Sequence, residues 1–262
     1  MNALILSGGF GSRLGYLGEK HPKALLDIGG RPLIDWIIER IIEIEIIDNI
    51  VVLCNGFFES QFTAWWVKHE DRKKISLISN GVSSPEKRLG AMGDVNFSLQ
   101  RESLYGPLTI FPGDTIFTFN VRKFFCEVKH TPQNGWLCLR TEKDEKKRRK
   151  CGVVGIDESG AVLSFEEKPK SSTEEYVYKG PCYLPPTLVS KIPKYCEQLK
   201  RANELPDNIG SFLGWAVNSL PFKGCVMRSG ECIDVGSLKE YLSAAQKLKT
   251  FQEDNDGKGF VL

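Results

Sequence analysis

Short apolar runs and longer amphipathic segments alternate along the first half of the chain. The apolar runs that are long enough for one buried strand are residues 3–6, 50–54, 75–78 and 108–111. Apolar residues recur at helical spacing over residues 33–42, and residues 58–68 form a second predicted helix. Strands that alternate with helices are typical of a parallel sheet with crossover helices, so the pattern predicts an α/β fold.

The second half of the chain has shorter and more varied elements. Residues 152–156 and 162–165 are β-like runs on either side of the turn sequence DESG, which predicts a hairpin. A helix capped by Asp207 or Asn208 follows, and a closing helix is expected over residues 238–251. No internal repeat divides the chain.

A dense charge run, EKDEKKRRK, occupies residues 142–150. Such a run can be a patch for nucleic acid or a solvated loop. Its charges have both signs and no aromatic residue is interleaved with them, so a solvated loop or hairpin tip is the better interpretation.

Composition narrows the class of protein. The chain has 262 residues, of which 41% are hydrophobic and 26% charged, with a net charge of +2. These values are ordinary for a globular domain and give no strong attraction to nucleic acid or to an anionic membrane. No apolar run approaches the length of a membrane span, and the chain enters its first strand without a signal segment, so we expect a cytoplasmic protein.

Eight cysteines raise the question of a metal site or a disulfide framework. No two of them have Cys-x-x-Cys spacing, which weakens the case for zinc. Most lie in apolar segments, which favours buried free thiols in a reducing compartment. The three histidines are scattered, so a histidine-based catalytic or metal cluster is not expected.

The candidate chemistry begins directly after the first strand. Residues 7–13 have the sequence SGGFGSR, and Arg13 and Lys23 supply positive charge nearby. Glycines allow the backbone to turn tightly and to approach a ligand closely, and the N–H groups of such a turn bind anions. The stretch therefore predicts a polyphosphate site, with a plain tight turn and solvated charges as the alternative.

Two familiar phosphate loops are excluded. The P-loop requires Gly-Lys-Ser/Thr after its glycines, whereas this chain has Gly-Ser-Arg. The dinucleotide fingerprint requires a third glycine at the position that Leu14 occupies.

The full N-terminal string resembles the signature of the sugar-1-phosphate nucleotidylyltransferases, also called nucleotide-sugar pyrophosphorylases. The matching pieces are GGFGSRL at 8–14, PKAL at 22–25 and GRPL at 30–33. The resemblance implies a Rossmann-like, mostly parallel but mixed sheet flanked by helices, of the nucleotide-diphospho-sugar transferase type. It covers essentially residues 2–245 and implies one domain over 1–262, without the β-helix domain that some relatives carry.

Later segments match the family in the same order, with departures. LGAMGD at 89–94 is a partial match, because Ala91 stands where threonine is usual. EEKP at 166–169 and DVGS at 234–237 match well. Lys179 and Pro181 depart from the usual pattern around Gly180 and Tyr183, which puts the sugar contacts in doubt.

The resemblance implies a nucleotide-binding part at about 1–115 and a sugar-phosphate-binding part at about 116–250. Its implied nucleotide-binding residues are Leu6, Ser7, Gly8, Gly9, Gly11, Ser12, Arg13, Lys23 and Gly90. Its implied sugar-phosphate-binding residues are Gly152, Glu167, Lys168 and Gly180. Arg13, Lys23 and Asp114 would be catalytic, and Asp114 and Asp234 would hold Mg²⁺. For Asp114 a helix-capping role is the alternative, and for Gly90 a plain helix entrance.

The expected activity is the Mg²⁺-dependent condensation of a nucleoside triphosphate with a sugar 1-phosphate, giving an NDP-sugar and pyrophosphate. A cytidylyltransferase for a choline, polyol or phosphonate acceptor is the first alternative, and an inactive ligand-binding regulator is a remote one. Neither nucleic acid nor membrane is an expected partner, and a homo-oligomer is possible. The sequence leaves the sugar and the base open, with a weak preference for a hexose or heptose.

Overall fold

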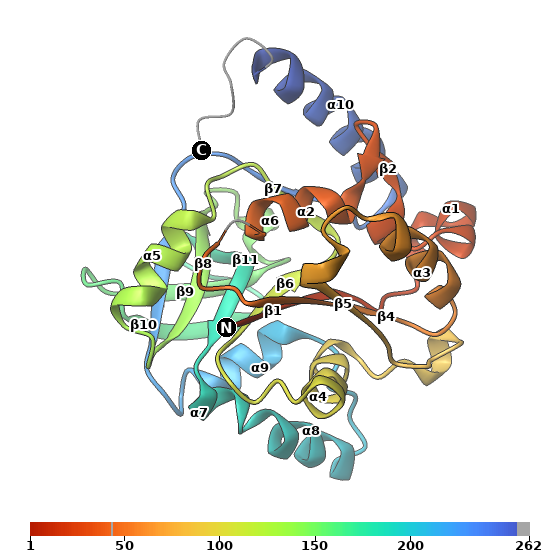
Figure 1. Cartoon of the computed structure of the whole chain (residues 1–262). Coiled ribbons are helices and arrows are strands. Elements are labelled where there is room, and N and C mark those ends of the chain that lie inside the picture. The colour runs from red at the N-terminus through yellow and green to blue at the C-terminus, as the bar shows by residue number, and fades with distance from the viewer. Residues whose placement is uncertain (43, 256–262) are drawn as a thin grey trace.

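The computed structural model of the protein describes residues 1–42 and 44–255, with side chains as far as residue 248. A nine-stranded mixed sheet lies at the centre, with helices on both faces (Figure 1). In chain order the strands of this sheet are β1 (Asn2–Ser7), β4 (Asn49–Cys54), β5 (Ile75–Ser79), β6 (Leu108–Pro112), β8 (Gly135–Thr141), β9 (Gly152–Ile156), β10 (Val162–Glu167), β11 (Tyr176–Leu184) and β12 (Phe222–Val226).

The two halves of the sheet are built differently. The order along one path is β10-β9-β11-β6-β1-β4-β5, and β8 pairs with both β11 and β12. Strand β1 pairs in parallel with β4 and β6, and β4 pairs in parallel with β5. Strand β11 is antiparallel to β6, β8 and β9, and β9 and β10 form the predicted hairpin. The expected parallel α/β half is therefore joined to a mostly antiparallel half, in which β8 and β12 are the parallel pair.

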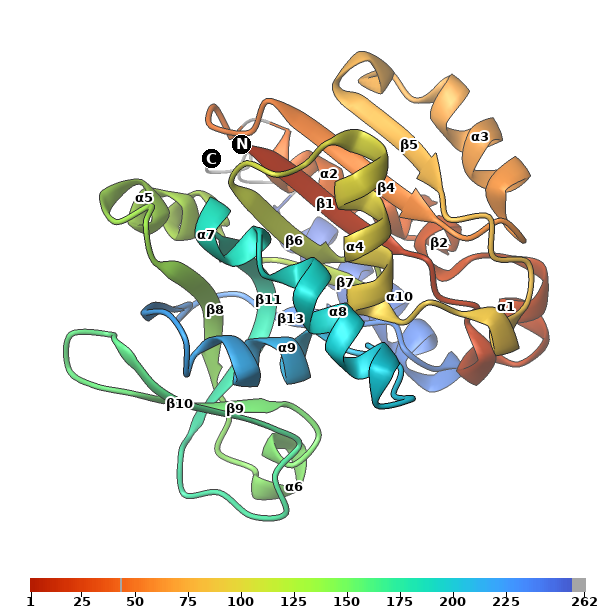
Figure 2. The ribbon, with the colours of Figure 1, turned by 90° about the horizontal axis from the view of Figure 1, so that it is seen from below.

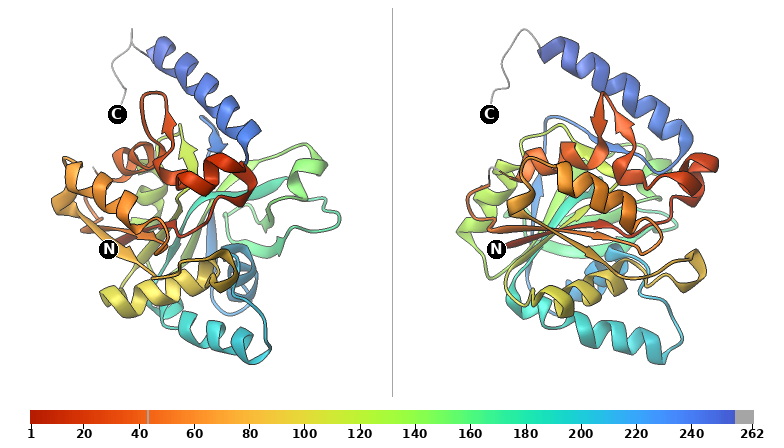
Figure 3. Two further views of the ribbon diagram at one scale, coloured as in Figure 1. Left: turned by 90° about the vertical axis from the view of Figure 1, so that its right-hand side faces the viewer. Right: turned by 45° about the vertical axis from the view of Figure 1, so that its right-hand side comes forward.

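Helices form one layer on each side of the sheet (Figures 1, 2 and 3). The layer on one face consists of α2 (Leu33–Ile41), α3 (Glu59–Lys68) and α5 (Arg122–His130), and α10 (Leu238–Asn255) lies over the outer side of the same face. The layer on the other face consists of α4 (Ala91–Glu102), α7 (Pro186–Val189), α8 (Ile192–Arg201) and α9 (Ile209–Ala216). The remaining α-helices are the short α1 (Tyr16–Lys20) and α6 (Glu145–Arg148). The remaining strands form two ribbons, β2 (Asp27–Ile28) with β3 (Arg31–Pro32), and β7 (Thr115–Phe117) with β13 (Cys232–Asp234).

The core explains why the first strand is a nearly continuous apolar run. Successive side chains of a strand point to opposite faces of the sheet. Ala3 and Ile5 pack into one apolar cluster, whereas Leu4 packs into the other. All three are fully buried, so β1 is covered on both faces and anchors the centre of the fold.

Strand order places the candidate site. From β1 the chain runs outward through β4 to β5, and then returns through α4 to β6 on the other side of β1. In open α/β sheets, ligands bind at the carboxyl ends of the strands where the order reverses in this way. The glycine loop after β1 and Asp114 after β6 both lie at this edge.

Several expectations about local structure are resolved. Of the two residues expected to cap the helix α9, Asn208 is the cap. Its side chain accepts a hydrogen bond from the Ser211 N–H at 2.7 Å. The charge run is largely exposed, as expected of a solvated segment, but it contains the helix α6 in place of a plain loop, and its Arg148 is buried. The Arg148 guanidinium donates to the backbone carbonyls of Glu142, Lys143 and Ser172, which explains its burial.

The cysteines match the sequence expectation. Five of them, Cys54, Cys138, Cys182, Cys196 and Cys225, are buried, and all eight are free thiols in the part of the chain that the structure describes. Burial raises the pKa of the Cys54 and Cys182 thiols to about 12.

Among the described helices, none combines the length and hydropathy needed to cross a membrane.

Candidate active site

The glycine loop leaves β1 and is fixed from beneath by a buried asparagine. Asn55, which directly follows β4, is fully buried, and its Nδ2 donates to the carbonyl oxygen of Gly8 at 3.1 Å. Its Oδ1 accepts a hydrogen bond from the Phe58 N–H at 2.9 Å. Gly11 has φ +65° at the far end of the loop, just before a single 3₁₀ turn over Ser12–Leu14. One asparagine therefore ties the loop to the neighbouring strand.

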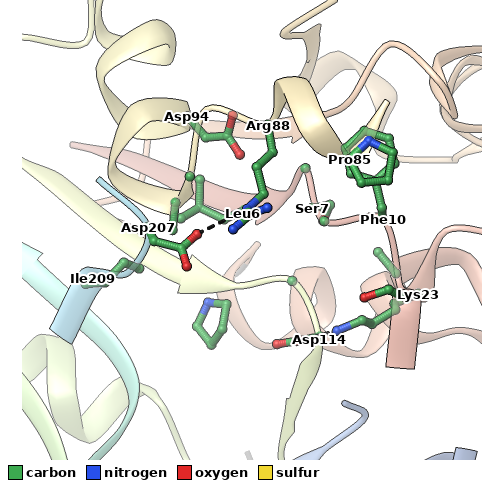
Figure 4. A pocket seen from close by; sticks show the side chains of 18 residues that line it. Leu6, Ser7, Phe10, Lys23, Pro85, Arg88, Asp94, Asp114, Asp207 and Ile209 are labelled. Atoms are coloured by element: carbon green, nitrogen blue, oxygen red, sulfur yellow. Dashed lines mark hydrogen bonds and ion pairs between the residues drawn. The ribbon is translucent and has the colours of Figure 1, made fainter. Parts of the chain in front are cut away.

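A cavity of about 550 Å³ opens over this loop (Figure 4). Eight of the predicted nucleotide and catalytic residues line it, namely Leu6, Ser7, Gly8, Gly9, Ser12, Lys23, Gly90 and Asp114. The lining residues that the sequence did not assign to the site include Phe10, Pro85, Arg88, Asp94, Gly113, Asp207 and Ile209. The cavity therefore joins β1, β6, α4 and the start of α9 in one concave site.

Gly90 connects two walls of this cavity. It has φ +78°, a conformation that favours glycine, at the start of α4. A Cβ there would lie 2.5 Å from the carbonyl oxygen of Pro206, so only glycine fits. The next N–H group, of Ala91, donates to the Asp207 carbonyl at 3.0 Å. Arg88 and Asp207, which both line the cavity, form an ion pair with Nε 3.6 Å from Oδ1 (Figure 4).

Two polar side chains in the cavity wall are buried. Asp94 is only 8% exposed, and its Oδ1 accepts a hydrogen bond from Asn80 Nδ2 at 2.7 Å. Burial raises the pKa of Asp94 to about 6, against the opposing effect of the Asn80 hydrogen bond. The hydroxyl of Ser7 is buried and has no hydrogen-bond partner among the described residues. An unpartnered hydroxyl is costly unless a ligand completes it.

The two predicted metal carboxylates converge, although 120 positions separate them in the sequence. Asp114 directly precedes β7, and Asp234 ends β13, which pairs antiparallel with β7. In this pairing Thr115 lies opposite Asp234. The Thr115 hydroxyl lies 3.0 Å from Asp234 Oδ1 and 3.5 Å from Asp114 Oδ1. Asp114 is therefore not a helix cap but one of a pair of carboxylates.

A lysine stands beside each carboxylate. Lys23 Nζ donates to Asp114 Oδ2 at 3.1 Å, and Lys179 Nζ lies 3.8 Å from Asp234 Oδ2. Partial burial raises the pKa of Asp234, whose side chain is half-exposed. The negative charge of Asp114 raises this pKa further. Lys179 and the Thr115 hydroxyl act in the opposite direction.

Arg13 does not line the cavity. It is exposed, and its guanidinium approaches Gly236, two residues after Asp234, where a Cβ would lie 3.3 Å from Arg13 Nη2. Arg13 thus lies at the carboxylate end of the site, near the chain segment that follows Asp234.

The predicted sugar-phosphate residues lie on the antiparallel half of the sheet, outside the lining of the cavity. Gly152 is opposite both Glu167 and Tyr178 in the strand pairing. A Cβ on Gly152 would strike the ring of Phe165, so close packing requires glycine. Burial raises the pKa of Glu167, and Lys168 Nζ lies 3.5 Å from its Oε1.

No group of three or more His, Cys, Asp or Glu side chains suited to a metal ion occurs among the described residues. The protein alone therefore offers two carboxylates, and Thr115 supplies a hydroxyl between them. Carboxylate and hydroxyl oxygens are the donors that hard divalent cations prefer.

Some residues of the site were not predicted, although their positions in the sequence carry a signal. Asn55 and Asn80 each follow the last residue of a parallel strand, the place where site residues collect. Thr115 is adjacent to Asp114, but its role depends on the pairing with β13, which no local pattern shows.

Comparison with known proteins decides the family. The model of the family described as "Nucleotidyl transferase" matches residues 2–250. The chain belongs to the nucleotidyl transferase family. This membership agrees with the N-terminal glycine loop and with the order of the later segments.

Similar proteins of known name extend this result. The catalytic subunit beta of mannose-1-phosphate guanylyltransferase from Dictyostelium discoideum is 26% identical over 245 residues, covering 93% of this nucleotidyl transferase chain. The chain spans only 63% of that relative's length.

Solved structures show the same fold. A UDP-glucose pyrophosphorylase has a TM-score of 0.78 at 15% identity, with 96% of this chain and 98% of that chain covered. A CTP:phosphocholine cytidylyltransferase from Streptococcus pneumoniae has a TM-score of 0.74 at 16% identity, with 94% and 98% covered. At such low identities the likeness concerns the fold alone, and it confirms the expected nucleotide-diphospho-sugar transferase type.

Proposed function

We propose that this chain joins a nucleoside triphosphate to a sugar 1-phosphate, giving an NDP-sugar and pyrophosphate. The observation that carries the proposal is the convergence of Asp114 and Asp234, through Thr115, at one end of the glycine-loop cavity. A polyphosphate site next to two carboxylates and two lysines has the parts that nucleotidyl transfer requires. The names of the curated relatives support a sugar-phosphate acceptor.

The division of labour follows the geometry. The cavity over residues 6–12, with Gly90 and Asp94 in its wall, takes the nucleotide. The loop N–H groups and Lys23 hold its phosphates, because a glycine turn and a lysine both favour anions. Arg13 approaches from the side of Gly236 and contacts the departing pyrophosphate. In this scheme residues 1–115 form the donor part, and residues 116–250, which include Asp234, form the acceptor part.

Asp114 and Asp234 would hold Mg²⁺. The donor set fits, because Mg²⁺ takes oxygen ligands, uses one or two protein carboxylates, and completes its coordination with phosphates and water. When bound, the ion neutralises charge on the reacting phosphates. Thr115 holds Asp234 in place by donating to its Oδ1, and the same hydroxyl lies 3.5 Å from Asp114 Oδ1.

The reaction needs positioning rather than a protein nucleophile. An oxygen of the sugar phosphate attacks the α-phosphorus, a new P–O bond forms, and the bond from the α-phosphorus to the bridging oxygen of pyrophosphate breaks. The protein brings the two anions together and compensates their repulsion with Lys23 and the other cations of the site. Gly152, Glu167, Lys168 and Gly180 bind the sugar phosphate in this scheme, with Glu167 accepting hydrogen bonds from sugar hydroxyls.

Guanosine triphosphate and mannose 1-phosphate are the first pair to test, because relatives carry the name mannose-1-phosphate guanylyltransferase. The assay is Mg²⁺-dependent pyrophosphate release over four nucleoside triphosphates and a panel of hexose and heptose 1-phosphates. Phosphocholine and a polyol phosphate belong in the panel as the cytidylyltransferase alternative. Turnover with a non-sugar acceptor alone would replace the proposal, and binding without turnover would indicate a regulator.

Asp114→Asn tests the metal assignment. We expect a loss of about 10²–10³ in kcat, the range for removing one group that stabilises the transition state electrostatically, while the thermal unfolding midpoint changes little. Glu158→Gln, at the exposed turn between β9 and β10, is the matched loss of a carboxylate and should leave kcat unchanged. Near-native pyrophosphate release by Asp114→Asn would refute the assignment.

A further inference from the structure

Strand β11 is interrupted at the point where it passes the carboxylate pair. Its pairing with β9 ends at Tyr178, opposite Gly152, and its pairing with β6 begins at Cys182, opposite Ile110. The register with β8 shifts over the same interval. Residues 179–181 therefore have no partner in the strand ladders of β6, β8 and β9.

The local sequence explains the interruption. Pro181 has no N–H group to donate to a ladder. Gly180 has φ +118°, and a Cβ on it would lie 3.1 Å from the sulfur of Cys138. Irregular strand segments of this kind re-aim a side chain, and they occur often beside active sites. Here the re-aimed side chain is Lys179.

Lys179 contacts the carboxylate of the pair that Lys23 does not contact. Its Nζ lies 3.8 Å from Asp234 Oδ2, and its side chain is 27% exposed. Lys23 Nζ contacts Asp114 Oδ2 at 3.1 Å, and that side chain is 15% exposed. With Thr115 between the carboxylates, the charges form a row with a lysine at each end, which we call the charged row: Lys23, Asp114, Thr115, Asp234 and Lys179.

The balance of charge in this row indicates what it binds. Without ligands, two lysines neutralise two carboxylates. A divalent cation held by the carboxylates leaves the positive charge of both lysines uncompensated, and anions must then balance it. Lys23 lines the nucleotide cavity, whereas Lys179 does not. The two lysines therefore serve two different phosphates.

We propose that Lys179 binds the phosphate of the acceptor, at the Asp234 end of the charged row. This inference rests on the proposed function and adds a residue to it. Lys168, the lysine that the sequence pattern indicates for this task, lies 3.5 Å from Glu167 and is 59% exposed. Lys179 is less exposed and lies at the carboxylate itself, so it carries the larger part of phosphate binding.

Equilibrium titration of the acceptor tests this proposal. Mannose 1-phosphate and glucose 1-phosphate are titrated into the Mg²⁺-loaded protein by calorimetry, alone and with the α,β-methylene analogue of GTP. For Lys179→Met we expect about 10- to 100-fold weaker binding, the range for losing a hydrogen bond to a charged group. Lys179→Arg should recover part of the affinity. Lys200→Met, which removes an exposed lysine on α8, is the control and should bind as the native chain does.

A purely structural role makes a different prediction. If Lys179 only neutralised Asp234, Lys179→Met would strengthen Mn²⁺ binding, measured by electron paramagnetic resonance, without changing sugar-phosphate affinity. Affinity of Lys179→Met within twofold of native would overturn the proposal, as would a native chain that binds neither sugar phosphate. Failure of the proposed function gives a different result. In that case the native chain would bind a sugar phosphate but release no pyrophosphate with any pair of substrates.

Discussion

Asp94 offers the sharpest test of how the cavity wall affects stability. Its pKa of about 6 lies roughly two pH units above the ordinary value of 3.8, because the side chain is buried in the first turns of α4. One pKa unit corresponds to about 1.36 kcal/mol, so the ionised side chain lowers the free energy of unfolding by about 3 kcal/mol at neutral pH. Asp94→Asn removes this cost and keeps an oxygen that accepts from Asn80.

The sign of the pH dependence follows from the raised pKa. Between about pH 4 and pH 6 the folded chain holds a proton on Asp94 that the unfolded chain has lost, so native stability falls as pH rises through this window. Below pH 4 the carboxyl is neutral in both states. The stabilisation by Asp94→Asn should therefore be small at pH 4 and reach about 1–3 kcal/mol at pH 8.

Urea unfolding at pH 4 and pH 8 measures this difference. Comparing the variant with the native chain at each pH cancels the titration of all groups that the two share. Glu158→Gln removes an exposed carboxylate and should give the same small difference, within about 0.5 kcal/mol, at both pH values. Equal effects of Asp94→Asn at pH 4 and pH 8 would show that Asp94 titrates as an exposed aspartate and would refute the argument.

Two further substitutions test the supports of the site. Asn55→Ala leaves the Gly8 carbonyl and the Phe58 N–H without their buried partner, so we expect a loss of about 1–3 kcal/mol in urea unfolding and weaker nucleotide binding; unchanged binding would mean that the loop holds its shape unaided. Gly90→Ala forces a Cβ against the Pro206 carbonyl at φ +78°, so the thermal midpoint should fall by several degrees; a midpoint within one degree of native would contradict the contact.

The parallel half of the fold was predictable because its pattern is local. Residues 3–6 are apolar without interruption since both faces of β1 are covered, and such a run predicts a buried strand without knowledge of the neighbours. The glycine loop was predictable for a similar reason. Its function requires a turn and a close backbone approach, and both requirements select glycine at fixed positions.

The other features depend on contacts between distant parts of the chain. Arg148 belongs to a run of charges that indicates solvent exposure. It is nevertheless buried, because three backbone carbonyls accept hydrogen bonds from its guanidinium. The approach of Asp114 to Asp234 requires β7 and β13 to pair across more than a hundred residues. In the sequence, Lys179 is visible only as a departure from a family pattern. The interruption of β11 that turns its side chain depends on which strands lie beside β11, and no local pattern shows those neighbours.

The charged row makes a final prediction about stability that does not depend on turnover. If each lysine balances its carboxylate, a double-mutant cycle on the metal-free protein should show a favourable coupling energy for each pair. The exposure of Lys179 and Asp234 limits their coupling to about 0.2–1 kcal/mol, as for surface pairs. Lys23 and Asp114 are closer and Lys23 is less exposed, so their coupling should be larger.

The cycles consist of Lys179→Met with Asp234→Asn and Lys23→Met with Asp114→Asn, measured by urea unfolding in a chelator. Removing Lys179 alone leaves Asp234 next to the like charge of Asp114, whereas removing Asp234 as well relieves that repulsion. The double variant should therefore lose less free energy of unfolding than the sum of the losses in the two single variants. Added Mg²⁺ should reduce both couplings, because the ion then balances the carboxylates in place of the lysines. A larger coupling for Lys179 than for Lys23, or couplings that Mg²⁺ leaves unchanged, would show that the row is not one electrostatic unit.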